Sequence, residues 1–394
     1  MNFANYKVVV VGSGLYGATL AERLAEDAKV PVLILDRRPH IGGNSWSEVD
    51  TKTGIEFHKY GSHLFHTNSV SVWDYVRRFS EFTSYRHRVK TLHKGRVFSM
   101  PINLDTISSF YGKYVCPSEA LNLINAEIAK ESDILPNSLE DKAILSIGRP
   151  LYEAFIKGYT AKQWQTQPNL LPPEIIGRLP VRFNFDDRYF SDRFEGLPTN
   201  GYADLITRML SNKKIDVLTS TDYFDIKDHF SDDQLIIYTG PIDRYFDYRC
   251  GRLNWRTLDF EFETIEQPDF QGTSVMNYAD ENVDYTRIHE FQHLHPERVN
   301  LSGKTLIAKE YSRFAGNNDE PYYPIGTRSD QVIYGMYKTM AQGRPNVIFG
   351  GRLGTYRYLD MHQAIGAALK CYSSRVIPFL RNGIVSAEVG SIDE

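Results

Sequence analysis

The start of the chain has two apolar runs with a glycine-rich segment and an amphipathic stretch between them, as a strand–helix–strand unit requires. Residues 7–11 (KVVVV) form a continuous apolar run, which is typical of a parallel strand buried on both faces. The glycine-rich segment 12–17 (GSGLYG) follows, and residues 18–28 then predict an amphipathic helix. A second apolar run, 31–35, predicts another buried strand and ends at Asp36. These residues therefore predict a βαβ unit.

The middle of the chain has the spacing of helices. One predicted helix begins at Pro117 and carries apolar residues at i, i+3 and i+7, namely Leu121, Ile124 and Ile128. A second follows a capping box at 138–141 and ends at Gly148. A third, over 151–157, has a proline in its first turn and is predicted to end at Gly158.

The pattern changes after about residue 165. Prolines interrupt residues 165–177, which predicts a loop, and alternating apolar and aromatic positions in 181–198 and 255–312 predict antiparallel strands. Two later segments, 235–240 and 347–352, predict further buried strands of the same parallel sheet. A helix is predicted to follow the second of them, near 362–372.

Composition restricts the class of protein. The chain has 394 residues, of which 42% are apolar and 24% charged, and this is ordinary for a globular protein of two or three domains. Because 45 basic residues nearly balance 49 acidic ones, charge gives no reason to expect nucleic acid or a membrane surface as partner. No apolar run is long enough to span a bilayer, and the N-terminus does not resemble a signal peptide. The three cysteines, far apart in sequence, predict reduced thiols, no zinc site and a cytoplasmic location.

The first glycine-rich segment has the context of a dinucleotide fingerprint. It lies between a predicted strand and a predicted helix, and Asp36 lies 24 positions beyond Gly12, near the spacing of about 20 that the motif requires. Gly12 permits the tight turn, Gly14 lets the backbone approach a pyrophosphate, and Gly17 lets the helix pack on the strand. Asp36 is predicted to accept a hydrogen bond from the ribose. The alternative is a glycine-rich turn that binds nothing.

Two further glycine pairs favour FAD over NAD. Gly42 and Gly43 follow the second strand directly, where the backbone can lie against a cofactor that extends beyond its pyrophosphate. Gly350 and Gly351 end the last predicted strand, and a helix is predicted to begin near Asp360. The N-terminus of that helix would stabilise negative charge on a reduced flavin.

These segments belong to a set that resembles the bacterial UDP-galactopyranose mutases over nearly the whole chain. Besides the fingerprint, the resemblance is carried by RRPHIGGNS (37–45), HKYGSHLFHTN (58–68), LYEAFIKGYTAKQW (151–164), RLPVRFNFDDRYFSD (178–192), YTGPIDRYFDYRCG (238–251), EPYYPI (320–325) and GGRLGTYRYLDMH (350–362). Asp36 stands where many members of the family have Glu.

The resemblance implies an isomerase that interconverts UDP-galactopyranose and UDP-galactofuranose without net redox change. It implies an FAD that must be reduced, whose N5 attacks the anomeric carbon of the sugar and forms an N5–sugar adduct. UDP leaves, the adduct opens to an iminium, the ring recloses and UDP returns. This is covalent catalysis by a cofactor. The resemblance also implies a homodimer and a role in making a cell-wall galactan.

The resemblance assigns roles to residues of this sequence. It implies that Arg178 and Arg287 hold the diphosphate catalytically, and that His63 lies by the flavin N5, either fixing its loop or transferring a proton. The implied substrate contacts are Phe155, Tyr159, Thr160, Trp164, Arg178, Tyr189, Asn277, Arg287, Tyr323 and Tyr358. The implied cofactor contacts are Gly12, Gly14, Tyr16, Gly17, Asp36, Asn44, His63, Leu64, Arg352, Asp360 and Met361.

Structural roles compete with several of these assignments. Periodicity alone places Phe155 in a helix core, and each Tyr, among 25, suits a core or rim position. His58, His63 and His66 raise the question of a metal, but no nearby carboxylate or cysteine in the sequence completes a ligand set, so no metal is expected. Trp164 begins the loop 165–177, which we expect to close over the substrate and exclude water.

The expected fold is α/β, with a discontinuous Rossmann-like FAD-binding domain, a small helical domain and an antiparallel β-sheet domain. The FAD-binding domain is expected at 1–80, 205–245 and 330–394, the helical domain at 100–165 with the mobile loop 165–177, and the sheet domain at 81–99, 178–204 and 246–329. Two other functions remain open: a flavin oxidoreductase of the amine-oxidase-like type, and a nucleotide-dependent binding protein without catalysis.

Overall fold

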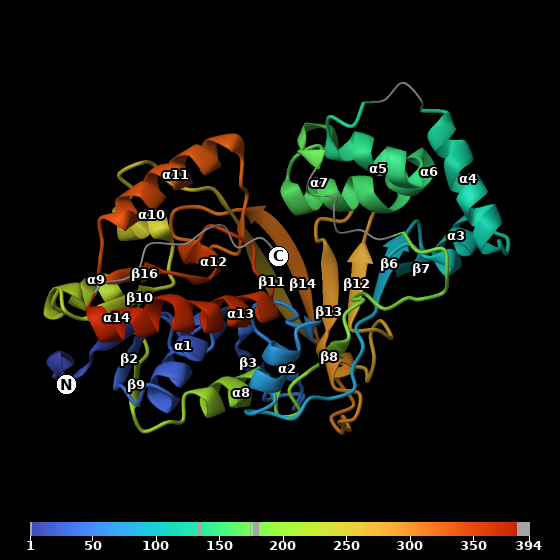
Figure 1. Cartoon of the computed structure of the whole chain (residues 1–394). Helices are drawn as coiled ribbons and strands as arrows, with labels where there is room; N and C mark the ends of the chain where they lie inside the picture. The colour runs from blue at the N-terminus through green and yellow to red at the C-terminus, as the bar shows by residue number, and fades with distance from the viewer. Residues whose placement is uncertain (1, 132–134, 174, 176–180, 384–394) are drawn as a thin grey trace.

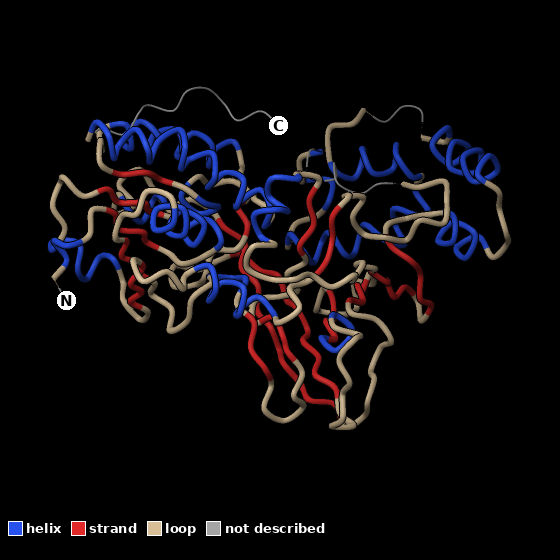
Figure 2. Tube along the Cα trace, turned by 60° about the horizontal axis from the view of Figure 1, so that its bottom comes forward, coloured by secondary structure: helices blue, strands red, loops and turns tan. Residues whose placement is uncertain are grey.

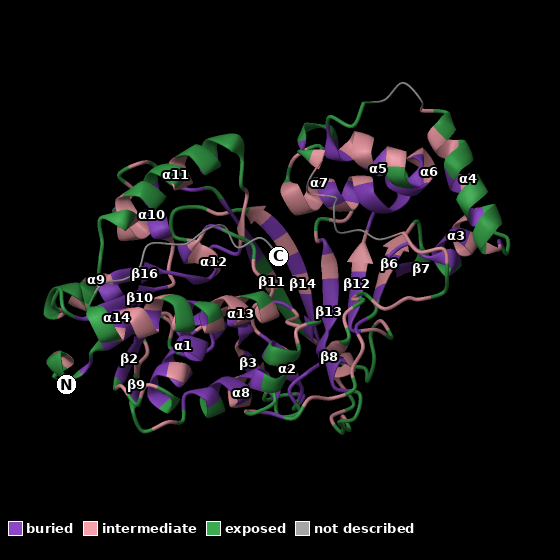
Figure 3. Cartoon of the chain, in the orientation of Figure 1, coloured by how far each residue is buried: buried purple, intermediate pink, exposed green. Residues whose placement is uncertain are grey.

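A computed structural model describes residues 2–131, 135–173, 175 and 181–383 of the chain (Figure 1). Two groups of helices lie at opposite sides of the molecule, and most strands lie within or between them (Figure 2). Buried residues concentrate in the strands and in α1, whereas α4 and α11 expose much of their surface (Figure 3). In these described ranges, no helix combines the length and apolar character needed to cross a membrane.

The first sheet has five parallel strands in the order β16-β10-β1-β2-β9. Their bounds are Val347–Phe349, Leu235–Tyr238, Val8–Val11, Val32–Leu35 and Ile215–Leu218. The strands predicted near residues 8, 32, 235 and 347 are thus confirmed, because continuous apolar runs can be buried on both faces of a parallel sheet. The sequence pattern did not reveal β9, which is only partly buried at this edge.

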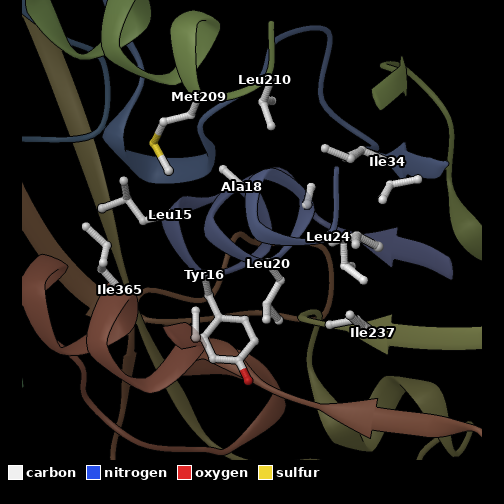
Figure 4. Packing of buried hydrophobic residues seen from close by; sticks show 14 of the residues in the cluster. Leu15, Tyr16, Ala18, Leu20, Leu24, Ile34, Met209, Leu210, Ile237 and Ile365 are labelled. Atoms are coloured by element: carbon white, nitrogen blue, oxygen red, sulfur yellow. The ribbon is translucent and has the colours of Figure 1, made fainter. Parts of the chain in front are cut away.

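Helix α1 (Leu15–Glu26) packs on this sheet and is buried on nearly every side. It begins three residues before the predicted start, because Gly14 is its N-cap. Leu20 and Leu24 point toward the strands, and Met209 of α8 (Gly201–Met209) and Ile365 of α13 (Met361–Cys371) lie nearby in the same hydrophobic cluster (Figure 4). The helix predicted at 362–372 is therefore confirmed and packs on α1.

The second sheet has seven strands in the order β15-β11-β14-β13-β12-β6-β7. Their bounds are Tyr323–Pro324, Trp255–Ile265, Thr305–Phe314, Arg287–Glu290, Val275–Tyr278, Val89–His93 and Arg96–Met100. Neighbouring strands are antiparallel except β12 and β6, which pair in parallel. The predicted antiparallel sheet is thus confirmed. It contains one parallel pair that the sequence did not indicate, because β6 comes from a distant part of the chain and no hairpin sets its direction.

The strands predicted over 181–198 are mostly absent from the described part of that segment. Only β8 (Phe194–Gly196) is a strand, and it pairs with β5 (Phe65–Thr67) in a separate two-stranded sheet. Upstream, the Asp186 carboxylate binds both the backbone and the guanidinium of Arg188. Such local side-chain bonds favour a turn over a strand.

The helices after β7 surround their own core. They are α3 (Leu104–Tyr111), α4 (Pro117–Ala129), α5 (Leu139–Ile147), α6 (Arg149–Leu151), a π-helical turn (Tyr152–Lys157) and α7 (Gly158–Trp164). The predicted capping box at 138–141 and the end at Gly148 are both confirmed. The helix predicted from Pro117 is confirmed as α4, with Ile124 buried in this core and Leu121 exposed.

Gly158 does not end a helix, contrary to the prediction. The chain continues through it from the π-helical turn into α7, with ordinary right-handed φ and ψ angles. A Cβ atom at Gly158 would lie 2.3 Å from the carbonyl oxygen of Ala279. The glycine is therefore needed for close approach of the helix to the loop after β12, and sequence cannot distinguish this use from a helix end.

The remaining elements are short, apart from the 15-residue helix α11. They are β3 (Ser47–Val49), β4 (Glu56–His58), α2 (Val70–Val76), α9 (Tyr223–Ile226), α10 (Ile242–Tyr245), α11 (Arg328–Gln342), α12 (Gly351–Gly354) and α14 (Ile377–Asn382), with a π-helical turn at Tyr372–Val376. Single 3-10 turns occur at Phe3–Asn5, Gly43–Ser45, Pro168–Leu170, Lys227–His229 and Phe291–Leu294.

Candidate active site

A long cavity lies at the carboxyl ends of the parallel strands. Val11, Leu35, Tyr238 and Gly351 line it from four neighbouring strands or the turns after them. The chain runs from β1 to β2 on one side and reaches β10 and β16 on the other, so this is the switch point where open α/β sheets bind ligands. Its empty space, with the open mouth included, is about 1260 Å³. Its lining runs from residues that follow β9 and β10 to Arg352 and Met361, which suits an extended ligand.

The fingerprint glycines have the geometry that their spacing predicts. Gly12 has φ +103°, and a Cβ there would lie 2.1 Å from the hydroxyl of Thr239. A Cβ on Gly17 would lie 2.0 Å from the carbonyl oxygen of Gly12, so this residue permits the contact of helix with strand. Gly14 differs, because a Cβ there would meet nothing within 4 Å and would point into free space. It is the N-cap of α1, and no described side chain caps that helix end. The cavity wall thus includes a helix N-terminus suited to phosphate.

Asp36 has a second role besides the one predicted. Its Oδ2 accepts hydrogen bonds from the backbone N–H (2.9 Å) and the hydroxyl (2.5 Å) of Ser13, and its Oδ1 accepts from the N–H of Arg38 (3.0 Å). The buried carboxylate therefore holds the glycine-rich loop against the end of β2. It also lines the cavity, where a ribose could share Oδ1.

Most of the other predicted cofactor contacts line the same cavity: Tyr16, Asn44, His63, Arg352 and Met361. Two do not. Leu64 packs against the hydrophobic cluster that contains Phe291, and Asp360 forms a capping box at the start of α13. The proposed contact of these two residues with a cofactor is therefore not supported by the shape of the cavity.

The far end of the cavity contains residues that sequence reasoning missed. They follow β9 and β10 and comprise Thr221, Asp222, Tyr223, Phe224 and Arg244. The Arg244 guanidinium donates to the Asp222 carboxylate at 2.7 Å and lies over the Phe224 ring, 4.8 Å from its centroid. Arg244 belongs to the segment 238–251 that carries the resemblance, although no role was assigned to it, and the other four residues belong to no motif. Their position after strands of a parallel sheet is the signal that could have indicated them.

At the other end of the cavity, Arg352 organises two of the predicted substrate tyrosines. Its guanidinium donates to the backbone carbonyls of Tyr322 (3.1 Å) and Leu359 (2.7 Å). It lies over the rings of Tyr358 and Tyr323, at 4.9 and 5.5 Å from their centroids. The two rings are 5.7 Å apart. Tyr323 and Tyr358 thus lie together beside the cavity-lining Arg352, although they come from separate segments.

Arg287, on β13, forms a second group with Tyr159 and Glu310. Its Nη2 donates a very short hydrogen bond to the Tyr159 hydroxyl, and its Nε lies 3.2 Å from Oε1 of Glu310. Burial alone would lower the pKa of Arg287, but Glu310 and the nearby Tyr159, Tyr189 and Tyr323 hydroxyls together raise it. Burial also raises the pKa of Tyr159, to about 12. The guanidinium therefore stays charged, and the phenol stays neutral at pH 7.

Comparison with known proteins explains this combination of a dinucleotide cavity with an arginine–tyrosine cluster. A family model described as UDP-galactopyranose mutase matches residues 154–358, and one described as an NAD(P)-binding Rossmann-like domain matches residues 10–79. A Klebsiella pneumoniae protein named probable UDP-galactopyranose mutase is 43% identical over 366 residues, which cover 93% of this chain and 94% of that protein.

The chain belongs to the UDP-galactopyranose mutase family. The family consists of isomerases, so the alternative of an amine-oxidase-like oxidoreductase is not favoured. A second relative, the dTDP-fucopyranose mutase of Escherichia coli, is 40% identical over 369 residues, or 93% of this chain and 97% of the relative. The crystal structure of a reduced UDP-galactopyranose mutase has a TM-score of 0.69 at 15% identity, covering 95% of this chain and 94% of that one. This last likeness shows the shared fold.

The other residues predicted to contact substrate in this mutase-family protein have unequal environments. Phe155 is almost fully buried and packs edge-on against Phe98 and Phe110, so its main contacts are those of a helix core. Trp164 packs at the margin of the same core, and Thr160 is buried in α7. The competing core interpretation of Phe155 is thus supported by its packing.

Asn277 and Tyr189 lie nearer to Arg287. Asn277 is the direct neighbour of Arg287 in the β12–β13 pairing, and its Oδ1 is buried without a hydrogen-bond partner among the described residues. A buried acceptor without a partner is costly unless a ligand satisfies it. Tyr189 is partly exposed and meets the rings of His87 and Phe190 edge-on. Arg178, the second predicted diphosphate arginine, lies outside the described residues, as do residues 174, 176 and 177 of the predicted loop.

The histidines of segment 58–68 form two separate arrangements. His58 Nδ1 accepts a hydrogen bond from the backbone N–H of His63 at 2.9 Å, and His63 Nδ1 lies 2.6 Å from the carbonyl oxygen of Gly61. Burial lowers the pKa of His63 to about 4, so it is neutral at pH 7. His66 instead pairs with Asp192 and stacks on Phe190. Both histidine groups therefore support loops, as the structural interpretation predicts for His58 and His66.

Within the described residues, two groups of side chains have potential metal-ligand atoms within 4.8 Å of one another, namely His66, Asp360 and His362, and Asp269, Glu290 and His293. Neither is the histidine set considered from sequence. Asp360 supplies the carboxylate that the sequence did not associate with His66, because it comes from the start of α13, almost 300 residues away.

Proposed function

We propose that this protein interconverts UDP-galactopyranose and UDP-galactofuranose with the help of reduced FAD. The observation that carries the proposal is the meeting of two features. A dinucleotide-sized cavity ends beside His63, Tyr323 and Tyr358, and a charged arginine, Arg287, lies near Tyr323 with a tyrosine hydroxyl bound to it. An enzyme that releases and recaptures a nucleoside diphosphate beside a flavin needs both.

The cavity residues fit FAD. The uncapped N-terminus of α1 and the open space at Gly14 suit the pyrophosphate, and Asp36 suits the ribose. Phe224, Tyr223 and Arg244 offer flat surfaces for the adenine at the far end. When bound and reduced, FAD supplies the nucleophilic nitrogen that the resemblance implies.

Arg287 would hold the diphosphate of the substrate. A guanidinium stays charged and meets phosphate oxygens with a planar pair of donors, so it stabilises the charge that grows on the departing UDP. Its bond to Tyr159 fixes it near a ring on which uracil could stack. Asn277 Oδ1, buried and unsatisfied among the described residues, would accept a hydrogen bond from the nucleotide.

A second candidate substrate comes from the second relative, a dTDP-fucopyranose mutase that is nearly as similar as the first. Thymine adds one methyl group to the base, and 6-deoxy sugars lack one hydroxyl. A hydrophobic contact with a single methyl contributes only about 1–3 kcal/mol, so both nucleotides could enter one site. The hydroxyl at C6 of the sugar would discriminate between the two substrates more strongly if a buried group of the protein must bind it.

The test is a conversion assay with purified, FAD-loaded protein. UDP-galactofuranose and dTDP-fucofuranose are each supplied, with the flavin oxidised and then reduced by dithionite, and products are separated by chromatography. Conversion of the UDP-sugar only after reduction is the expected result. Faster conversion of the dTDP-sugar would assign the second function. Conversion of neither sugar by protein whose yellow flavin has been bleached by dithionite would refute both.

We also propose that the protein is a cytoplasmic homodimer that supplies galactofuranose to a cell-wall galactan. The support is the family resemblance and the three cysteines, none of which forms a disulfide in the described structure. Light scattering during gel filtration tests the dimer, and a mass near 45 kDa would contradict it.

A further inference from the structure

A continuous series of hydrogen bonds and one ion pair joins the wall of the cofactor cavity to Arg287. It begins at Ser62, next to the cavity-lining His63, and passes through His289 and Glu310. Ser62 lies in the segment 58–68 that carries the resemblance, but the sequence assigned no role to Ser62, His289 or Glu310.

The β13–β14 pairing places the members of this series on one face. Arg287 and His289 are two residues apart on β13, so their side chains point to the same side, and Arg287 pairs directly with Glu310 on β14. The Glu310 carboxylate is shared between them. Its Oε1 lies 3.2 Å from Nε of Arg287, and its Oε2 lies 2.9 Å from Nε2 of His289.

The protonation of Glu310 determines how His289 is oriented. Burial alone would raise the pKa of Glu310, but Arg287 and His289 outweigh burial and lower it to about 2. A carboxylate can only accept hydrogen bonds, so Nε2 of His289 must carry its proton and donate it. Nδ1 of His289 then lies 2.7 Å from the Ser62 hydroxyl. Both ring nitrogens are therefore engaged, and each binds a different part of the site.

Ser62, at the other end of the series, lies in a turn that packs closely on the sheet. A Cβ atom on Gly61 would lie 2.9 Å from the Phe260 ring of β11, so the loop lies closely against the sheet. His63 Nδ1 bonds to the Gly61 carbonyl, which links the cavity wall to the same turn. His289 itself is only 2% exposed. Displacement of this imidazole would disturb the turn at His63 and the carboxylate at Arg287 together.

We propose that His289 is a positioning residue that sets the orientation of Arg287 through Glu310 and the position of the cavity wall at His63 through Ser62. The inference deepens the proposed function and rests on it, because it treats Arg287 as the diphosphate ligand and His63 as a neighbour of the flavin. His289 itself contacts neither group directly in this scheme.

Two conservative variants separate the two connections. In His289→Gln, the side-chain amide reaches the place of Nε2 and can still donate to Glu310, but it leaves Ser62 without a partner. In His289→Asn, the shorter amide lies near the place of Nδ1 and can accept from Ser62, but it leaves Glu310 without a donor. Ser62→Ala is the matched control for His289→Gln, because it breaks the same connection from the other side. Circular dichroism and melting temperature identify any variant that has not folded.

The readouts are the dissociation constants of FAD and of UDP, and the visible spectrum of the bound flavin. Loss of one hydrogen bond to a charged partner weakens binding by roughly 10- to 100-fold. We expect His289→Asn to weaken UDP by that factor and to leave FAD within threefold of wild type. His289→Gln and Ser62→Ala should change the flavin spectrum and weaken FAD, with UDP affinity within threefold. Equal effects of the two variants on both ligands, or no effect of either, would overturn the proposal.

Failure of the proposed function has a different signature. If wild-type protein binds FAD but neither UDP nor a UDP-sugar, then the assignment of Arg287 is wrong. The FAD measurements on His289→Gln and Ser62→Ala still decide whether the Ser62 connection positions the cavity wall. An unchanged dissociation constant of FAD and an unchanged flavin spectrum in both variants would refute the proposed role of the Ser62 connection.

Discussion

Replacement of Gly14 by alanine should separate folding from cofactor binding in this protein. Gly14 has φ −61°, which alanine adopts easily, and the added Cβ would meet no atom within 4 Å. The new methyl group would stand at the N-terminus of α1, where the structure offers its clearest site for a pyrophosphate. The fold should therefore tolerate the substitution while the cofactor does not.

The size of each effect can be worked out. Alanine is a poorer N-cap than glycine by up to about 1 kcal/mol, but it reduces the entropy of the unfolded chain by roughly 0.4–1 kcal/mol. The free energy of unfolding without cofactor should thus change by less than about 0.5 kcal/mol. Hydrogen bonds from backbone N–H groups to a charged phosphate contribute about 1.5–3 kcal/mol each. Loss of one of them raises the dissociation constant of FAD by about 10- to 100-fold, and loss of two raises it by about 100-fold or more.

The assay titrates cofactor-free protein with FAD, follows the quenching of flavin fluorescence, and measures urea unfolding of the same preparation. Gly12→Ala is the contrasting variant, because its positive φ and the 2.1 Å approach to Thr239 should prevent correct folding. A Gly14→Ala protein that binds FAD within threefold of wild type would show that the pyrophosphate does not lie at α1.

The remaining predictions concern other parts of the molecule. Arg287→Ala should lower turnover by more than 100-fold with FAD still bound, which corresponds to a loss of about 3 kcal/mol of transition-state stabilisation. Near-normal rates in steady-state kinetics would contradict this. Trp164→Ala should weaken UDP-sugar binding, as calorimetry would show; an unchanged dissociation constant removes Trp164 from the site. Gly158→Ala should destabilise the fold by about 1–3 kcal/mol, because its Cβ would clash with a backbone carbonyl. Gly335→Ala, which has free space in the middle of α11, should stabilise it by about 1 kcal/mol. Urea unfolding measures both, and equal effects would refute the packing argument. Burial lowers the pKa of His87 to about 3, so between pH 6.5 and 3 only the unfolded chain binds a proton there. The free energy of unfolding should therefore fall as pH decreases, by up to about 1.4 kcal/mol per pH unit, and His87→Gln should reduce that slope; an identical slope would contradict it.

Local sequence was sufficient for the elements whose physics is local. Continuous valines can be buried only between other elements, so residues 7–11 and their counterparts near 235 and 347 became parallel strands as predicted. The glycines of the fingerprint were equally predictable, because a Cβ on Gly12 or Gly17 would clash with the protein, and the space at Gly14 is left open where the motif predicts a pyrophosphate. The resemblance to the mutases then provided the activity, which no periodicity could reveal.

Other features depended on contacts between distant segments. The same residue type, glycine, ends a helix at 148 but permits close packing at 158, and only the position of the Ala279 carbonyl distinguishes the two. The parallel pairing of β12 with β6 joins segments that are more than 180 residues apart, so no hairpin signal could predict its direction.

The candidate site also combines features set by the sequence with features set by the fold. The sequence by itself determined which residues can bind phosphate, ribose and charge, because those capacities belong to the side chains: Arg287, Asp36 and the open glycine at 14. Only the tertiary structure decided that Glu310 and His289 lie between Arg287 and Ser62, and that Arg244 and Phe224 complete the far end of the cavity. The physical reason is that an orientation is fixed by hydrogen bonds from neighbouring strands and loops, and those neighbours are chosen by the fold.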